Sequence, residues 1–511
     1  MINTKLNNKL KKLGIAIPEV LLPSDGIDMQ KWPVIACDQY TSQPEYWSEL
    51  ENVVGNEPST LRLILPEVYL ESSNLEKRIN KINITMKKYI DESILVPQKP
   101  GLIFLERKTP RVKSRKGLIL AVDLEKYDYD KNSQTLIRAT EKTVIERLPP
   151  RVKIRKNAPV EVPHIQLLVD DPDMTVIEPI AEAVAKLAGN IRRITTNNIA
   201  NGSSYGNTND SNSTCDSTNN STNGSTNSST IGSAGNSINN IEKIYDFDLV
   251  MGGGHVKGYM ITGQEIIHNI ATALEKLSDS VNFHEKYGVN AENGVLLFAV
   301  GDGNHSLASA KVHWENVKSS ILPEDRENHP ARYAMVEVIN VHDEGLIFEP
   351  IHRVLFNVDY KKLMDAMKKY FGNYSPVSIK IFSSKENMDS EIYAIRKKAT
   401  NCHFFPFVSG YGYSLAIIEK PLHNLVVAEL QEFLDFYIEN NPTTKIDYIH
   451  GDDVVTAIGT KTGNLGFYLP PIDKHQLFKT VIADGTLPRK TFSMGEAEEK
   501  RYYLECRKIT L

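Results

Sequence analysis

The sequence has few cysteines, no long apolar run and no excess of basic residues, and each of these features excludes a class of protein. The four cysteines are Cys37, Cys215, Cys402 and Cys506 in a chain of 511 residues. They form no CxxC pair, which argues against a disulfide framework and a zinc site. No apolar stretch is long enough to span a bilayer, and the first residues lack a signal-peptide core. We therefore expect a cytoplasmic protein without a membrane partner.

The charge balance is slightly acidic. Lys and Arg number 59 against 64 Asp and Glu, so the formal net charge is −5. A general nucleic-acid binder usually carries a basic face, so this balance argues against a nucleic-acid partner. A hydrophobic fraction of 41% is enough for real cores. The Walker A, HExxH and GxSxG motifs are also absent from the sequence.

The clearest boundary in the chain is a low-complexity segment. Of residues 201–240, 33 of 40 are Asn, Ser, Thr or Gly, which is too little apolar surface to offset the entropy of ordering. We predict a disordered insertion at 195–240, an N-terminal part at 1–194, a further part at 241–360 and a C-terminal α+β part at 361–511. Strand-like and helix-like stretches alternate outside the insertion, which predicts an α/β or mixed α+β fold.

The stretch "VLLFAVGDGNHSLASAK" predicts a buried strand, a turn and a helix. The turn at residues 301–306 contains Gly301, Asp302, Gly303, Asn304, His305 and Ser306. A helix N-terminus after glycines favours phosphate binding, His305 can move a proton, and Asp302 can bind a metal. The alternative is a plain turn in which Asn304 or Ser306 only caps the helix.

Further candidates follow other strand-like runs. Asp38 comes directly after an apolar run at 33–37, where it suits acid–base work or caps a turn equally well. Arg138 and Glu141 lie three residues apart, on one face of an expected helix. Basic residues around Arg151, Arg353 in "EPIHRVL", and "PRKT" at 488–491 are candidates for anion binding or for ordinary surface and turn positions.

These motifs together resemble the DUF1015 family of uncharacterised bacterial and archaeal proteins. The stretches that carry the resemblance are "VIACDQYTSQPEYW", "RATEKTVIERLPPRVKIRKNAPVEVPHIQLLVDD", "FAVGDGNHSLASAK", "EPIHRVL" and "LPRKTFSMGEAEEKRYYLECRKI". The 301–306 turn also resembles the Asp-Gly-His-His-Arg turn of the ParB/sulfiredoxin-like fold. Asp302, Gly303 and His305 match that turn, whereas Asn304 and Ser306 replace its first His and its Arg. Arg353 and the basic cluster around Arg151 are the candidates for supplying the missing charge.

The resemblance implies a nucleotide- or phosphate-binding protein, because proteins of the ParB/sulfiredoxin-like fold hold nucleotide phosphates with this turn. The function we expect is a serine-kinase-like phosphotransferase that uses ATP or ADP with Mg²⁺ near Asp302. Asp38, Glu141, Asp302 and His305 are the expected catalytic residues. The expected phosphate ligands are Gly301, Gly303, Asn304, Ser306, Arg138, Arg151 and Arg353. The alternatives are a ParB-like nucleotide-binding regulator or DNA-associated protein without turnover, and a non-catalytic metabolic scaffold.

Overall fold

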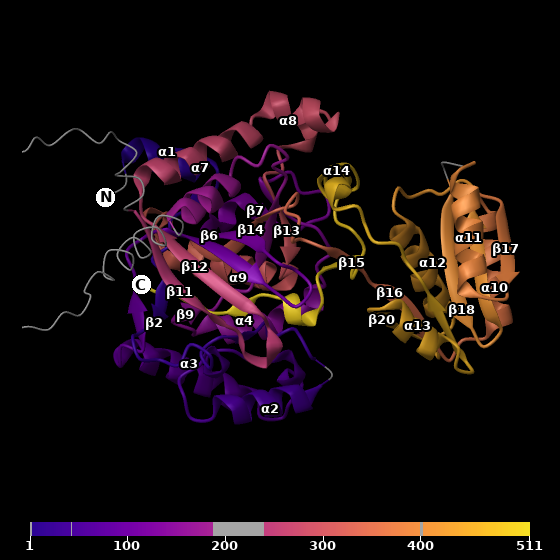
Figure 1. Ribbon diagram of the computed structural model, residues 1–511, viewed down its shortest axis with the longest axis horizontal. Helices are drawn as coiled ribbons and strands as arrows, with labels where there is room; N and C mark the ends of the chain where they lie inside the picture. Colours follow the sequence, from indigo (N-terminus) through magenta and orange to yellow (C-terminus); the bar gives the residue numbers. More distant parts are fainter. Residues whose placement is uncertain (1–2, 42, 188–239, 399–401) are drawn as a thin grey trace, which may run out of the picture.

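The computed structural model describes residues 3–41, 43–187, 240–398 and 402–511 (Figure 1). Apart from residue 240, the predicted insertion at 195–240 lies outside these residues. The described chain is a mixed α/β structure, so the predicted fold class is confirmed. The predicted division into parts stays a prediction. Within the described residues, no helix is both long and apolar enough to cross a membrane.

A ten-stranded mixed sheet forms the larger part of the molecule, which we call the body. Most neighbouring strands run antiparallel, but β10 pairs in parallel with β14, and β8 pairs in parallel with β13 and β7. Strand β1 adds to β6 outside the main order. In spatial order the strands are β11 (Ile241–Asp248), β12 (His255–Ile261), β5 (Leu102–Lys108), β6 (Arg115–Asp123), β14 (Tyr333–Asn340), β10 (Gln166–Val169), β13 (Phe298–Asp302), β8 (Ile137–Ala139) and β7 (Tyr127–Asp128), with β1 at Ile15–Ala16.

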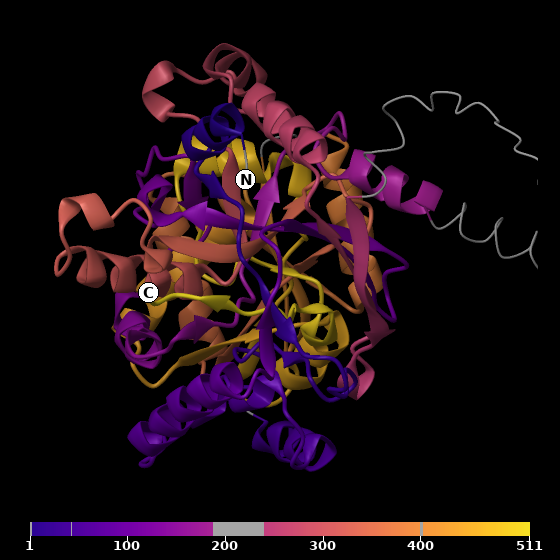
Figure 2. The same cartoon turned by 90° about the vertical axis from the view of Figure 1, so that its left-hand side faces the viewer.

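Helices cover both faces of this sheet, because its strands bury side chains on both sides (Figures 1 and 2). One face packs against α1 (Thr4–Lys12), α7 (Gln264–Leu277) and α9 (Asn304–Lys318). The other packs against α2 (Pro44–Val54) and α3 (Leu75–Asp91). Other helices of the body include α4 (Leu148–Lys156), α8 (Ser280–Tyr287) and α14 (Leu477–Asp484).

A second, six-stranded sheet forms a separate lobe from residues 352–467 (Figure 1). Its strands are all antiparallel, in the order β17 (Val377–Phe382), β19 (Gly412–Ile418), β18 (His403–Ser409), β21 (Asn464–Phe467), β16 (His352–Phe356) and β20 (Lys445–Ile449). One apolar cluster packs α10 (Tyr360–Gly372) and α12 (Val426–Asn440) on this sheet, and a second packs α11 (Lys385–Arg396) and α13 (Asp452–Gly459).

After the lobe, the chain returns to the body and pairs there with three early or central segments. These pairs are β22 (Phe492–Met494) with β15 (Phe348–Pro350), β23 (Tyr502–Tyr503) with β3 (Val34–Ile35), and β24 (Arg507–Lys508) with β9 (Val160–Glu161). A further short pair joins β2 (Leu21–Pro23) to β4 (Leu95–Pro97). The last residues of the chain therefore lie beside residues 34–38, at the place where the site is built.

Short 3-10 helices fill several connections: η1 (Thr60–Arg62), η2 (Glu67–Tyr69), η3 (Leu124–Lys126), η4 (Ile145–Arg147), η5 (Val250–Gly252), η6 (Ala291–Asn293), η7 (Pro323–Asp325), η8 (Pro330–Arg332), η9 (Lys474–Gln476) and η10 (Ala497–Glu499).

One local prediction is wrong. Arg138 and Glu141 do not share a helix, because Arg138 lies in β8 and Glu141 bridges to Leu487. Pairing with β13 and β7 overrides the local helical spacing.

Candidate functional site

The 301–306 turn joins β13 to α9, as the sequence predicts. Asp302 ends the strand, and Gly303 takes a left-handed φ of 80° before the helix begins at Asn304. No side chain caps this helix. The Asn304 side chain instead accepts a hydrogen bond from the Thr140 backbone N–H at 3.2 Å, which ties the turn to the neighbouring strand β8. The first turn of α9 therefore keeps the amide groups and positive dipole end that favour an anion.

Two carboxylates lie beside this helix end. Asp302 Oδ2 is 3.1 Å from Lys500 Nζ, and its Oδ1 accepts from the Gly303 backbone N–H at 2.9 Å. Glu141 Oε1 accepts a hydrogen bond from the Thr491 backbone N–H at 3.3 Å. Burial raises the pKa of Glu141, and the charge of Asp302 adds to this rise. Glu141 is thus a half-buried carboxylate with a raised pKa, which suits a general base.

Asp38 reaches the same place from the segment after β3, and His305 lies in the first turn of α9. Burial favours a higher pKa for Asp38, but His164, the Gln39 amide and two lysines outweigh it, so the net shift is downward. Burial lowers the pKa of His305 to about 4, and its Nε2 accepts from the Val144 backbone N–H at 3.2 Å. His305 is therefore neutral at pH 7.

Lys490 and Lys500 supply the positive charge of the site. Lys500 is buried, whereas Lys490 is exposed and has a φ of 56°, a conformation rarely adopted by residues other than glycine. The charge of Lys490 lowers the pKa values of Asp38, Glu141 and His305. The pKa of His450 in the lobe is lowered to about 4, chiefly by burial, and the charges of both lysines add to this fall. The two lysines therefore lie close enough to the lobe for their charges to reach His450.

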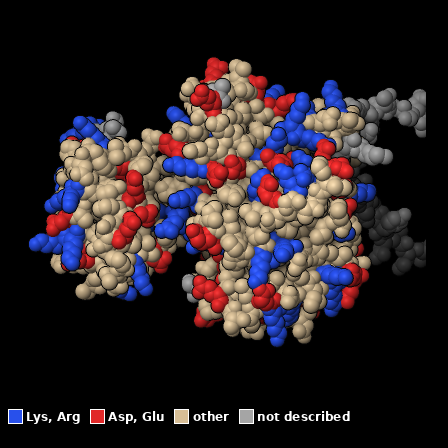
Figure 3. All heavy atoms as spheres, turned by 180° about the vertical axis from the view of Figure 1, so that it is seen from behind, with Lys and Arg blue, Asp and Glu red and all other residues tan. Residues whose placement is uncertain are grey.

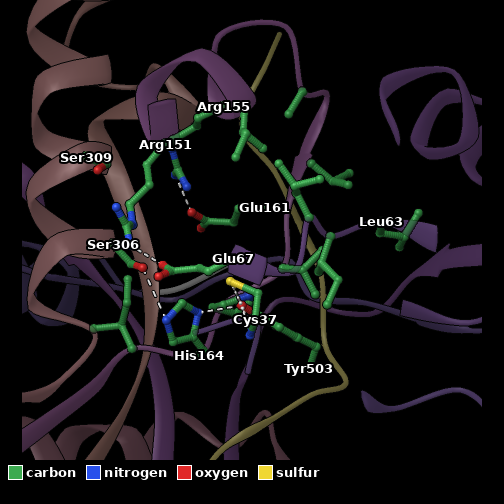
Figure 4. A pocket seen from close by; sticks show the side chains of 18 of the residues that line it. Cys37, Leu63, Glu67, Arg151, Arg155, Glu161, His164, Ser306, Ser309 and Tyr503 are labelled. Carbon is green, nitrogen blue, oxygen red and sulfur yellow. Dashed lines mark hydrogen bonds and ion pairs between the residues drawn. The ribbon is translucent and has the colours of Figure 1, made fainter. Parts of the chain in front are cut away.

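A mostly apolar pocket adjoins the turn (Figure 4). Its polar rim includes an ion pair between Arg151 and Glu67. On the same rim, Ser306 Oγ is 3.2 Å from His164 Nε2. The apolar lining comes from η1, η2, α3, α4 and the segment around β9: Leu63, Ile64, Leu65, Leu70, Met86, Ile154, Ala158, Val160, Val162, Pro163 and Ile165. A cleft lined mainly by apolar side chains with a few polar groups at its rim has the character of a small-molecule site.

Comparison with protein families gives one match. A family model described as "Protein of unknown function (DUF1015)" matches residues 21–199 and 225–437. The chain belongs to the DUF1015 family. The matched residues include the 301–306 turn and every residue that lines the apolar pocket except Tyr503. No curated protein matches the chain.

Solved structures with some likeness to this DUF1015 protein include a conserved hypothetical protein from Pyrococcus furiosus. It is 14% identical, with a TM-score of 0.27, and the alignment covers 42% of this chain and 75% of that one. A free serine kinase in complex with AMP is 12% identical, with a TM-score of 0.28 and coverages of 42% and 73%. A mutant of a free serine kinase in complex with ADP is 13% identical, with a TM-score of 0.29 and the same coverages. These values are too low to transfer a ligand or an activity.

The structure brings together the four residues expected to be catalytic. The charge of Asp302 raises the pKa of Glu141, and the charge of Asp38 raises the pKa of His305. The charge of Lys490 lowers the pKa of Asp38, Glu141 and His305. The four residues therefore share one electrostatic environment. Among the expected phosphate ligands, Gly301, Gly303, Asn304 and Ser306 form the turn itself. Arg151 lies on the pocket rim. The roles of these residues stay predictions.

Two of the expected phosphate ligands are engaged elsewhere. The Arg138 guanidinium donates to the backbone carbonyls of Thr135 and Asn293, at 2.9 and 2.7 Å. Arg353 is fully buried and donates to the Gln431 side chain at 2.8 Å and to two backbone carbonyls. One of these carbonyls is that of Arg489, so Arg353 supports the loop that carries Lys490.

The site could hold Mg²⁺ only with help from a ligand. The described residues contain no group of three or more His, Cys, Asp or Glu side chains placed for a metal. Mg²⁺ in nucleotide sites usually takes one or two carboxylates and completes its shell with phosphate oxygens and water. Asp302 can offer one such oxygen, in exchange for its contact with Lys500.

Sequence reasoning missed Lys500, Tyr503 and Glu67. His164 is likewise not among the residues that the sequence predicts for the site. Lys490 belongs to the "PRKT" stretch that was noted as a candidate. Lys500 and Tyr503 come from the final segment, which reaches the site through its pairing with β3. No local pattern marks them, because their function depends on contacts across more than 150 residues of sequence.

Proposed function

We propose that the chain is a nucleotide-dependent phosphotransferase that acts on a small hydroxy acid such as serine. One observation carries the proposal: Lys490 and Lys500 face three carboxylates at an uncapped helix N-terminus, beside an apolar pocket. Phosphoryl transfer depends mainly on positioning and charge neutralisation. This arrangement of dipole, lysines and carboxylates provides both.

In this proposal the pocket binds the base of the nucleotide and the turn binds its phosphates. The apolar floor suits the base, and Ser306 on its rim leads towards the start of α9. The phosphates would then lie against the helix amides, with Lys490 and Lys500 neutralising their charge. Bound Mg²⁺ would neutralise phosphate charge next to Asp302.

Glu141 would orient and deprotonate the acceptor hydroxyl. Its pKa is raised by burial, so it is a stronger base than an exposed glutamate. Asp38, whose pKa is lowered, would stay ionised and hold the acceptor or the metal. Neutral His305 would hold the backbone of Val144 in place.

The test is a turnover assay on the full chain. The protein is incubated with ATP, ADP or CTP, Mg²⁺ and a panel of amino and hydroxy acids, and products are followed by ³¹P NMR. We expect a new phosphomonoester with at least one hydroxy acid. Binding of a nucleotide without any turnover would favour a nucleotide-binding regulator instead. A protein that neither binds nor turns over any of these nucleotides would overturn the proposal.

A further inference from the structure

Ser306 has contacts that a phosphate-binding serine does not need. It lies in the first turn of α9, lines the apolar pocket, and its Oγ is 3.2 Å from His164 Nε2. His164 precedes β10 and is buried, with 6% of its surface exposed. Figure 4 shows the hydroxyl and the imidazole pointing at each other on the pocket rim. A hydroxyl within hydrogen-bond reach of an oriented imidazole is the arrangement of an activated nucleophile.

The other ring nitrogen of His164 is held by Tyr503. His164 Nδ1 is 2.8 Å from the Tyr503 hydroxyl, and the two rings meet edge to face. The Tyr503 hydroxyl donates to Cys37 Sγ at 3.0 Å and accepts from the Cys37 backbone N–H at 3.2 Å. Burial raises the pKa of Tyr503 well above its ordinary value, so the phenol stays protonated.

These contacts determine the tautomer of His164. Because Tyr503 gives its only hydrogen to Cys37, it accepts a hydrogen from His164 Nδ1. The lone pair of the neutral imidazole then lies on Nε2, which faces Ser306. Asp38 Oδ2 is 3.8 Å from the same Nε2. That distance is too long for a hydrogen bond, but it is close enough to stabilise an imidazolium once Nε2 takes a proton.

We propose that Ser306 is a nucleophile that accepts a phosphoryl group from the bound nucleotide, with His164 as its general base. The Ser306 Oγ–P bond forms as the bond from phosphorus to the leaving nucleoside phosphate breaks. The Oγ proton moves to His164 Nε2. The amides at the start of α9 and the ammonium groups of Lys490 and Lys500 stabilise the charge on the transferred group. The identity of the donor rests on the proposed function, whereas the reactivity of Ser306 does not.

The reactivity is tested with a fluorophosphonate probe on the full chain. Attack by Ser306 forms an Oγ–P bond, releases fluoride and passes the proton to His164. Intact mass and peptide mapping should show one phosphonyl group on Ser306, and Ser306→Ala should abolish it. Ser309→Ala is the matched control, because Ser309 lines the same pocket one turn later but its hydroxyl is bound to the His305 carbonyl. That variant should label as the wild type does.

The role of His164 is tested with His164→Gln and Tyr503→Phe, at matched thermal stability. We expect His164→Gln to slow labelling by about 100-fold or more, since general bases contribute on the order of 10²–10⁴. Tyr503→Phe should slow it less, because the imidazole remains. Absence of labelling in a folded protein, or labelling that persists in Ser306→Ala, would overturn the inference.

A second arm with [γ-³²P]ATP separates this inference from the proposed function. An acid-stable phosphoserine at Ser306, with turnover lost in Ser306→Ala, supports both. Probe labelling of Ser306 in a protein that neither binds nor uses nucleotides would refute the phosphotransferase and the nucleotide as donor. Full turnover by Ser306→Ala would refute the nucleophile and leave the phosphotransferase in place.

Discussion

Glu141 is the residue on which the proposed chemistry depends most. It accepts from the Thr491 backbone N–H and lies near Lys490, which lowers its pKa, but burial and Asp302 outweigh these effects. The net shift is upward, so the carboxylate loses its charge at a higher pH than an exposed glutamate. A base of this kind is active only above its own pKa.

Replacing Glu141 with glutamine should therefore separate binding from turnover. We expect kcat of Glu141→Gln to fall by about 10²–10⁴, because the amide keeps the shape but cannot take a proton. Nucleotide affinity, measured by isothermal titration calorimetry, should stay within about threefold, since the base is not a phosphate ligand. The acid limb of the kcat profile should lie above pH 4.5, the ordinary pKa of a glutamate, and should vanish in the variant. A loss below tenfold would contradict this role.

His305 makes a different contribution, to stability. Its pKa is about 4 in the folded chain, below the value of about 6.5 for an unfolded histidine. The unfolded state therefore binds more protons between these values, and the stabilisation from neutral His305 is complete above pH 6.5 and is lost as the pH falls towards 4.

Urea unfolding at pH 7 and pH 4.5 measures this effect. We expect the free energy of unfolding to fall more in the wild type than in His305→Gln, which has no proton to gain. His313 and His450 also have pKa values of about 4, so only the difference between the two proteins isolates His305. An equal fall in both would contradict the assignment.

At this scale, the sequence predicts the residues that lie next to a local signal and misses the others. Asp302, Gly303 and His305 stand in one turn whose glycines and strand-like lead are visible in the sequence. Lys500 meets Asp302 across almost 200 residues of sequence, and no local pattern encodes that contact. Arg353 looked like an anion ligand, yet burial and its backbone partners make it a support for the loop of Lys490.

At the scale of the elements, the junction of β13 and α9 forms the proposed anion site. Gly303 has a φ of 80°, and an added Cβ would lie 3.1 Å from Ile165 Cα on the neighbouring segment. A side chain here meets both backbone strain and a tight contact, so the start of α9 would have to shift.

Gly303→Ala should therefore weaken both the fold and the site. We expect a loss of about 1–3 kcal/mol in the free energy of unfolding and a weaker affinity for nucleotide. The control is Gly372→Ala at the end of α10, where an added Cβ meets nothing within 4 Å and φ is not in the left-handed region. Urea denaturation and calorimetry on both variants measure the two effects. A Gly303→Ala protein that binds as tightly as the wild type would contradict the role of this turn.

Elements with a strong period were predictable, and those determined by distant pairing were not. Ile79, Ile82 and Met86 are spaced as a helix requires, and their side chains are buried on α3. The spacing of Arg138 and Glu141 suggested a helix as well. There the parallel pairing of β8 with β13 and β7 determines the conformation instead.

At the scale of the whole molecule, the site depends on the path by which the chain returns from the lobe to the body. The lobe at residues 352–467 separates β15 from the segment that carries Lys490, and the chain then re-enters the body through β22 and β23. The pairing of β3 with β23 inside the body therefore brings the first and last parts of the sequence together (Figure 1). Periodicity in a single sequence carries no information on such a route.

The surface charge favours a small ligand over duplex DNA. Figure 3 shows basic and acidic side chains interspersed on the face it displays, and the net charge is −5. Binding to DNA at physiological salt needs several phosphates neutralised by a clustered basic surface. In a gel-shift assay at about 150 mM salt we expect no complex at micromolar protein. Tight and sequence-dependent binding would support a DNA-associated protein instead.

Calorimetric titration of ATP and ADP into the full chain tests the central claim, that the turn at residues 301–306 holds phosphates between Lys490 and Lys500. The comparison is between the wild type, Lys490→Ala and Lys368→Ala, a matched exposed lysine on α10 in the lobe. A charge-assisted contact contributes about 1.5–3 kcal/mol, so we expect Lys490→Ala to weaken binding by roughly 10- to 100-fold. Lys368→Ala should have no effect. Equal affinity in all three proteins, or no binding to any of them, would contradict the account.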